Sequence, residues 1–180
     1  IYFHEKPFLP LGFDSPYIFY VNSFSKMLCI TGWRIGYLYA HKMHRKQLRS
    51  IHDYIGLCAP SLLQQAIANF LRDNNFGDTF TQQLRKNVRQ SFNFLHSTLK
   101  NLDFEIPAID GGCFIWACLP QGYDDGFDFA YSLYQTTGVA TIPGEHFSSN
   151  CTKWLRFNIA RPNDEISKAA ELIANFIESK

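Results

Sequence analysis

The first 80 residues alternate between short β-forming runs and segments whose apolar residues recur at helical spacing. Aromatic and β-branched residues concentrate at 17–21 and 33–40, which predicts two strands. Apolar residues then recur every three or four positions over 42–59, which predicts a helix that stops where a proline follows Ala59. A second helix is predicted over 61–72, with its first serine as the N-cap.

The remaining 100 residues begin with the longest helical pattern of the chain. Leucine, valine and phenylalanine side chains share one face over 80–99, which predicts a helix long enough to connect two domains. The stretch 104–120 alternates around the Gly111-Gly112 pair, which predicts a hairpin or a bulged strand. The closing elements are expected in the order helix, strand, strand, helix, at 128–137, 139–142, 154–159 and 163–177. Because strands alternate with helices, we expect an α/β fold in two parts.

Composition and charge narrow the class of protein without pointing to a partner. The chain is 46% apolar and 18% charged, which is typical of a folded globular protein. Its formal net charge of +1 provides no field that draws the molecule to nucleic acid or to an anionic membrane. No run approaches the roughly 18 apolar residues of a membrane span, so no membrane partner is predicted. Five cysteines, an odd and sparse set, are typical of reduced thiols and predict a cytoplasmic protein.

The stretch "NSFSKMLCITGWRIGY", residues 22–37, combines groups suited to a phosphate beside a reactive amine. Lys26 follows a predicted strand, and strand ends are where open α/β sheets bind ligands. Ser23 and Ser25 offer hydroxyl donors, Arg34 offers a planar donor fork, and nearby glycines allow close backbone approach. A solvated lysine in a turn is the alternative for Lys26 alone. The combination favours a lysine that reacts with an aldehyde cofactor carrying a phosphate, because a lysine amine is a useful nucleophile only when its charge is suppressed.

Other functional classes rest on weaker patterns. The segment 41–49 contains two histidines, two lysines and two arginines, which suits either a nucleic-acid-binding module or a solvated helix face, and we expect the solvated face. Cys113 and Cys118 lack a second Cys or His pair at zinc-finger distance, so no metal site is predicted. The chain contains no Gly-x-Ser-x-Gly elbow, which argues against a serine hydrolase.

Segments spread over the whole chain resemble class I and II aminotransferases, which are fold-type-I enzymes that use pyridoxal 5′-phosphate. The family's cofactor-lysine segment is similar to "SFSK…TGWRIGY". The segment after its Asp-x-x-Tyr strand is similar to "IYFHEKPF", its Pro-Gly segment to "GVATIPGEHF", and its substrate-carboxylate strand to "WLRFNIAR". The resemblance covers essentially all 180 residues.

The resemblance implies the C-terminal portion of such an α/β enzyme. Residues 1–79 are then the end of the large cofactor-binding domain, 80–100 a connecting helix and 101–180 the small C-terminal domain. The family's aspartate that pairs with the cofactor's pyridine nitrogen would precede Ile1, so the chain is expected to be a fragment that is inactive alone. The resemblance also implies a homodimer for the full-length protein.

Site residues follow from the same resemblance. It implies that Lys26 bonds to the cofactor aldehyde and then moves a proton between the substrate α-carbon and the cofactor. Arg34, Ser23 and Ser25 would bind the cofactor phosphate, and the phenol of Tyr2 would contact the cofactor's ring oxygen.

The substrate side of the site is implied less completely. Arg156 would bind the substrate α-carboxylate with two parallel donors, and Arg161 is a nearby rival for that role. The activity implied is amino transfer from an L-amino acid to a 2-oxo acid. "IHDYIGLCAPSLLQQA" resembles the branch that handles aromatic amino acids, kynurenine and methionine. Carbon-sulfur lyase chemistry on the same scaffold remains open.

Overall fold

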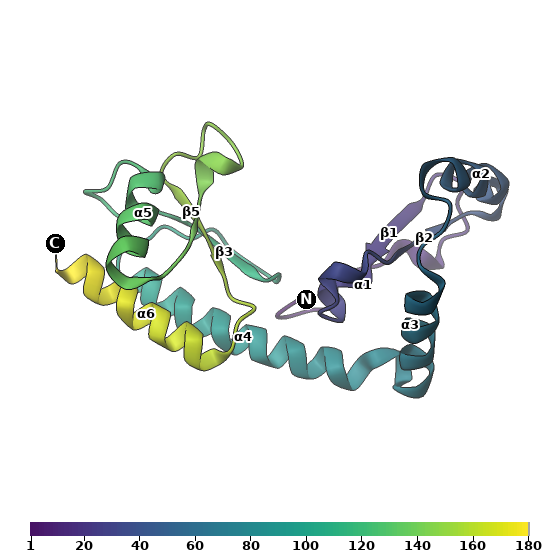
Figure 1. Cartoon of the computed structure of the whole chain (residues 1–180), viewed down its shortest axis with the longest axis horizontal. Helices are drawn as coiled ribbons and strands as arrows, with labels where there is room; N and C mark the ends of the chain where they lie inside the picture. The colour runs from purple at the N-terminus through teal and green to yellow at the C-terminus, as the bar shows by residue number, and fades with distance from the viewer. Residues whose placement is uncertain (180) are drawn as a thin grey trace. The chain divides into compact units, whose positions relative to one another are not determined.

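Residues 1–179 are described by a computed structural model, in which they form two compact units. The first unit contains Ile1 and Glu5–Gln83, and the second contains Tyr2–His4 and the chain from Leu84 onward. The boundary falls inside α4 (Asp78–Asn101), the long helix labelled in Figure 1. Within the described residues, no helix is both long and apolar enough to cross a membrane. The mixture of helices and strands agrees with the predicted α/β class.

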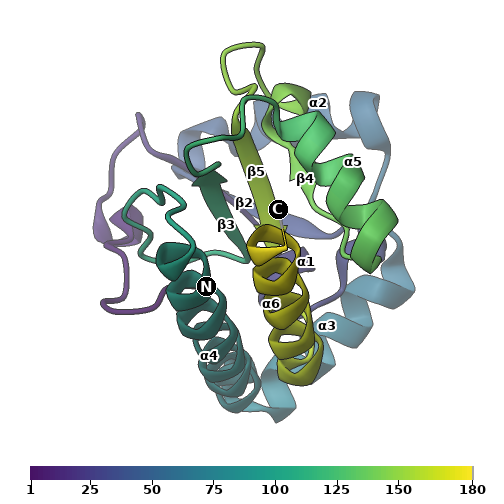
Figure 2. The same ribbon diagram turned by 90° about the vertical axis from the view of Figure 1, so that its left-hand side faces the viewer.

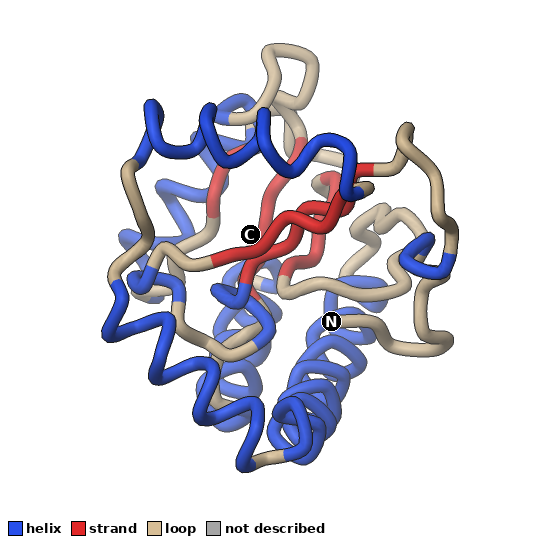
Figure 3. The backbone as a smooth tube through the Cα atoms, turned by 90° about the vertical axis from the view of Figure 1, so that its right-hand side faces the viewer, coloured by secondary structure: helices blue, strands red, loops and turns tan. Residues whose placement is uncertain are grey.

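The first unit is built around a two-stranded antiparallel sheet; Figure 3 draws its strands, like all strands of the chain, in red. β1 pairs with β2 so that Ser23 faces Gly36. A small apolar core forms beside the sheet from Leu28, Ile35 and Ile67. The elements are β1 (Phe19–Ser23), α1 (Phe24–Met27), β2 (Gly36–Ala40), α2 (Arg45–Gly56) and α3 (Ser61–Asp73). Short 3-10 turns of the chain lie at Pro10–Gly12, Thr31–Trp33, Lys42–His44, Asn75–Gly77 and Gly144–His146.

Three boundaries in this unit differ from those that the residue pattern predicted. The strand expected at 17–21 lies two residues later, as β1. The strand expected at 33–40 is shortened to β2, because Arg34 has a φ of 55°, in the left-handed region, and cannot continue an extended strand. The helix expected over 42–59 is shorter, because a 3-10 turn precedes α2 and the helix ends at Gly56.

The second unit packs helices against a three-stranded antiparallel sheet with the order β3-β5-β4. Figure 2 shows α4 and α6 side by side, and the Ser91 hydroxyl on α4 donates to Asn163 Oδ1 on α6 at 2.7 Å. The remaining elements are β3 (Phe114–Cys118), α5 (Gly126–Thr137), β4 (Ile142–Pro143), β5 (Trp154–Asn158) and α6 (Asn163–Glu178).

Alternation along β3 and β5 separates an apolar face of this sheet from a mixed one. Every second residue is buried in the main core of the chain, and these residues are Ile115, Ala117, Leu155 and Phe157. The intervening positions face away from that core: Phe114, Trp116, Trp154 and Arg156. Leu99, Leu133 and Ile173 from the three helices complete the core. The sheet therefore presents one arginine among aromatic residues on its other face.

Two predictions for the second unit need correction. The Gly111-Gly112 pair does not close a tight hairpin, because Gly111 forms an isolated bridge with Tyr2 instead. Only one bridge, Glu105 to Cys118, joins the two halves of the stretch 104–120. The strand expected at 139–142 is reduced to the two residues of β4. In both places the partner strand comes from distant sequence, which a local pattern does not specify.

Leu155→Ala should reduce the free energy of unfolding of the second unit by about 2–5 kcal/mol, because the side chain is fully buried between sheet and helices. Chemical denaturation monitored by circular dichroism is the measurement. Leu62→Ala is the control, since Leu62 on α3 is 85% exposed and should change stability by less than about 0.5 kcal/mol. Equal effects of the two substitutions would contradict the assigned core.

Candidate active site

The lysine singled out in the sequence lies directly after β1. Ser23, the last residue of β1, caps α1, and its Oγ accepts a hydrogen bond from the Ser25 amide at 3.3 Å. Lys26 is the third residue of α1 and is exposed, whereas Ser25 is buried. Because the Ser23 oxygen accepts from the backbone, its own O–H remains available to donate to a ligand. The arrangement presents one amine and one hydroxyl at the end of a strand.

Arg34 belongs to the same local structure. The Phe24 amide donates to the Ile35 carbonyl at 3.1 Å, which ties the start of α1 to the residue after Arg34. The guanidinium is exposed, and its Nη1 donates to the Thr31 carbonyl at 3.2 Å. This hydrogen bond orients a planar donor group beside the strand end while leaving its other N–H groups free. Ser23, Ser25, Lys26 and Arg34 are therefore brought into one connected segment of the first unit.

A glycine makes this close pairing of the strands possible. An added Cβ on Gly36 would lie 2.5 Å from the Asn22 carbonyl oxygen and 3.2 Å from Ser23 Cα. Contacts this short between Cβ and backbone are essentially never seen in proteins, so any larger residue must push β2 away from β1. The position of Ser23 and α1 relative to Arg34 thus depends on Gly36.

The other two predicted site residues, Tyr2 and Arg156, lie in the second unit. Tyr2 forms the bridge with Gly111, and the neighbouring Phe3 amide donates to the Asp110 carbonyl at 2.7 Å. The guanidinium carbon of Arg85 lies 3.8 Å from the centroid of the Tyr2 ring, which is the distance of a cation–π contact. Tyr2 is therefore held by its backbone and by one ring face, and it is half-buried.

Arg156 lies in the middle of β5, on the sheet face opposite the core. Its Nε is buried and has no hydrogen-bond partner, and among residues 1–179 no carboxylate forms an ion pair with it. The guanidinium carbon lies 4.3 Å from the Phe114 ring centroid and 4.6 Å from that of Phe147. A buried donor without a partner is costly in free energy, so Arg156 is a candidate for binding an anion.

The rival arginine has a different environment. Arg161 donates from Nε and Nη2 to Glu165 Oε2, at 2.9 and 2.7 Å, across one turn at the start of α6. Because that carboxylate already accepts from two of its nitrogens, Arg161 is less suited to bind a substrate carboxylate than Arg156.

Two aromatic neighbours of Arg156 were not identified from the sequence. Phe114 lies on β3, diagonal to Arg156 across the pairing of β3 with β5. Strand alternation would have placed Phe114 on the correct face once that pairing was known. Phe147 follows the 3-10 turn at Gly144–His146, and no local pattern predicts that this turn brings it onto the sheet.

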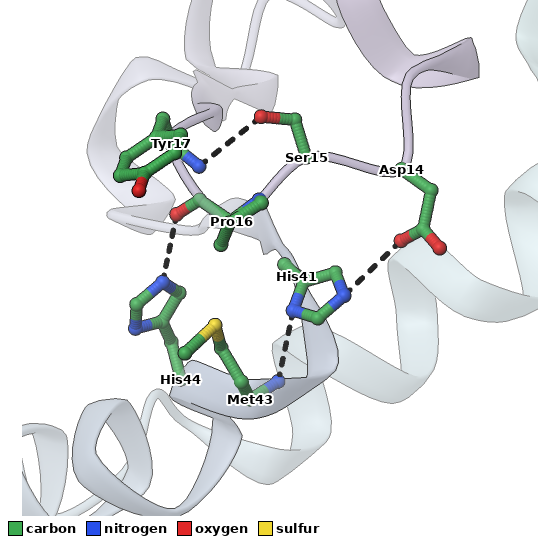
Figure 4. A network of polar contacts seen from close by, with 7 residues as sticks. All are labelled: Asp14, Ser15, Pro16, Tyr17, His41, Met43 and His44. Atoms are coloured by element: carbon green, nitrogen blue, oxygen red, sulfur yellow. Dashed lines mark hydrogen bonds and ion pairs between the residues drawn. The ribbon is translucent and has the colours of Figure 1, made fainter.

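Figure 4 shows the polar contacts of His41 and His44, the two histidines of the basic segment 41–49. His41 Nδ1 accepts from the Met43 amide at 3.3 Å, and its Nε2 pairs with Asp14 at 3.2 Å. His44 Nε2 contacts the Pro16 carbonyl at 2.8 Å, so this nitrogen must donate. The lysines and arginines of the segment are exposed, as on a solvated helix face. The histidines therefore hold the loop before β1 in place.

Comparisons with known proteins place the chain in a family. Residues 6–173 match the family model described as Aminotransferase class I and II, and the chain belongs to this family. A probable N-acetyl-LL-diaminopimelate aminotransferase of Bacillus subtilis is 27% identical over 89% of this chain and 40% of its own length. A probable aspartate aminotransferase of Methanocaldococcus jannaschii is 28% identical over 99% of this chain and 47% of its own length.

A solved structure supports the same fold. It comes from Methanococcus jannaschii, is described as similar in its active site to kynurenine aminotransferases, and matches with a TM-score of 0.85 at 23% identity. The match covers 98% of this chain and 47% of that one. The chain thus has the fold of the corresponding part of a fold-type-I aminotransferase, and it spans less than half the length of these relatives.

Gly36→Val should separate β2 from β1 beside Lys26, because the added side chain meets the Asn22 carbonyl. Amide hydrogen exchange at Phe24, which donates to Ile35, should become about tenfold faster or more. Gly32→Val is the matched control, since no atom lies within 4 Å of the added Cβ there. Unchanged protection of Phe24 in Gly36→Val would show that the close pairing does not hold this segment.

Proposed function

We propose that the full-length protein transfers an amino group from an L-amino acid to a 2-oxo acid, using pyridoxal 5′-phosphate. The observation that carries this proposal is the exposed amine of Lys26 on the same short segment as the Ser23 hydroxyl and the Arg34 guanidinium. The segment lies within the part of the chain that matches the aminotransferase family. Relatives named as aminotransferases support the reaction type.

The residues of the first unit suit a phosphate-bearing aldehyde. Arg34 and Ser23 offer charged and neutral donors for phosphate oxygens, and the buried Ser25 hydroxyl would be a third donor. When bound, pyridoxal 5′-phosphate supplies an electron sink that lowers the cost of removing the substrate α-proton. Lys26 would hold the cofactor by its amine and, once displaced by substrate, carry that proton as general base and acid.

Two residues of the second unit have proposed roles of their own. The phenol of Tyr2 would donate to the cofactor's ring oxygen, and the contact with Arg85 would limit rotation of the ring. Arg156 would bind the substrate α-carboxylate, since it offers parallel donors and has no carboxylate partner. A carboxylate bound there also satisfies the buried Nε.

For the amino donor we propose an aromatic amino acid, kynurenine or methionine. Support comes from the resemblance of 51–66 to that branch of the family and from the aromatic residues around Arg156. A carbon-sulfur lyase on the same scaffold is the second candidate. We also propose a cytosolic homodimer, in line with the five free cysteines and with the family. Inactivity of the 180-residue segment on its own stays a prediction.

Reduction of the cofactor-loaded full-length protein with borohydride should fix the cofactor on Lys26, because its amine is exposed on the same segment as the groups that suit the phosphate. Peptide mass mapping is the measurement. Lys42, also exposed and in the same unit, is the internal control and should remain unlabelled. A label on any other lysine would remove the basis of the proposed reaction.

Arg156→Lys should reduce kcat/KM by about tenfold to a hundredfold for every amino donor, because a point charge does not reproduce two parallel donors. The absorbance of the bound cofactor should stay unchanged. Arg161→Lys is the matched control and should have little effect, since Arg161 pairs with Glu165. A loss confined to one class of donor would mean that Arg156 contacts substrate side chains.

A panel of amino donors with 2-oxoglutarate should separate the two candidate reactions. Transamination predicts a 2-oxo acid product with no ammonia, and the highest kcat/KM for aromatic donors, kynurenine or methionine. Lyase chemistry on a cystathionine-like substrate predicts release of ammonia and a thiol without need for 2-oxoglutarate. Product analysis by mass spectrometry is the measurement, and stoichiometric ammonia would favour the lyase.

A further inference from the structure

The face of the second sheet that points away from the core carries an aromatic cluster around its one arginine. Phe114 and Phe147 both contact the Arg156 guanidinium, at 4.3 and 4.6 Å from ring centroid to guanidinium carbon. We refer to Phe114 and Phe147 as the ring pair. Phe114 is half-buried, whereas Phe147 is 48% exposed. Because Phe147 is exposed, other contacts must hold its ring against the guanidinium.

That support comes from a second layer of aromatic rings. Phe147 packs edge-to-face on Trp116 at 5.6 Å, and Trp116 stacks on Trp154 at 5.7 Å and 11°. The Phe147 amide also donates to the Gly144 carbonyl at 2.9 Å, which closes the 3-10 turn that precedes Phe147. Trp116 lies directly opposite Arg156 in the pairing of β3 with β5. The cluster is therefore anchored to the same two strands that position the arginine.

An aromatic ring and a carboxylate position a neighbouring guanidinium in different ways. A carboxylate would occupy the N–H donors of Arg156, as Glu165 does for Arg161. A ring attracts the cation through its quadrupole and excludes water, yet it does not occupy the N–H groups that a ligand needs. Rings close to the guanidinium also reduce the rotamer freedom that is lost when a ligand binds.

We propose that Phe114 and Phe147 are positioning residues that hold the Arg156 guanidinium ready for a single carboxylate, with Trp116 fixing Phe147. The inference rests on the proposed function, in which Arg156 binds the substrate α-carboxylate. It goes further by assigning the affinity of that site to rings that need not touch the reacting atoms. The apolar surroundings favour a ligand that brings one carboxylate and no second acidic group to this face.

The test uses full-length protein without cofactor and 3-phenylpropanoate, a monocarboxylate that has no amino group and cannot react. Binding is followed by tryptophan fluorescence, because Trp116 and Trp154 belong to the cluster while Trp33 lies in the other unit. Phe147→Leu should raise the dissociation constant about three- to tenfold, as expected for one lost cation–π contact. Phe147→Tyr retains a ring and should restore binding to within about twofold.

Matched variants separate positioning from folding. Phe94→Leu removes a ring of similar exposure, 45%, on α4 and should leave the dissociation constant unchanged. Arg156→Lys should abolish most of the fluorescence response. In the loaded enzyme, Phe147→Leu should raise KM for all donors by the same factor as the dissociation constant, with kcat nearly unchanged.

The outcomes distinguish this inference from the proposed function. If Phe147→Leu and Phe114→Leu bind the probe as tightly as the wild type while Arg156→Lys does not, the ring pair has no positioning role and the proposed function stands. If borohydride labels a lysine other than Lys26 but the ring-pair variants weaken probe binding as expected, the positioning role stands and the proposed reaction is wrong. If Phe147→Tyr is as impaired as Phe147→Leu, the aromatic ring is not the cause and the inference is overturned.

Discussion

The antiparallel pairing of β3 with β5 is the interaction on which the second unit and the position of Arg156 depend. Because side chains alternate along paired strands, one register buries Leu155 and Phe157 and simultaneously turns Arg156 to the other face. A shift by one residue would bury the guanidinium and expose the core. The free energy of core packing therefore also fixes the position of the arginine.

Arg156 illustrates how a charged side chain is kept available inside a folded protein. Arg161, five residues later, pairs with Glu165 on the surface, and such an exposed pair contributes little to stability. Arg156 instead contacts aromatic rings, and its buried Nε has no partner. Leaving a donor unsatisfied lowers stability, and natural proteins concentrate such strain at functional sites.

The first unit also depends on a strand pairing, that of β1 with β2. Gly36 allows β2 to approach β1 at Ser23, and the Phe24 amide then reaches the Ile35 carbonyl. The left-handed conformation of Arg34 turns the chain between the 3-10 turn and β2. Lys26 and Arg34, eight residues apart, are thereby held on one connected segment without any direct contact between their side chains.

Local sequence was sufficient wherever a structure is stabilised by neighbours along the chain. The helix over 163–177 was predicted to within one residue of α6, because Ile166, Ala170 and Ile173 repeat at helical spacing. The motif around Lys26 and Arg34 identified the family, which the match over residues 6–173 confirmed. Strand limits were less accurate, because the ends of β1, β2 and β4 depend on their partners. Tertiary structure alone decided that Gly111 pairs with Tyr2, that Phe114 and Phe147 contact Arg156, and that Arg161 is paired while Arg156 is not. These contacts join residues that are distant in the chain, or depend on side-chain directions, and local pattern carries no information about either.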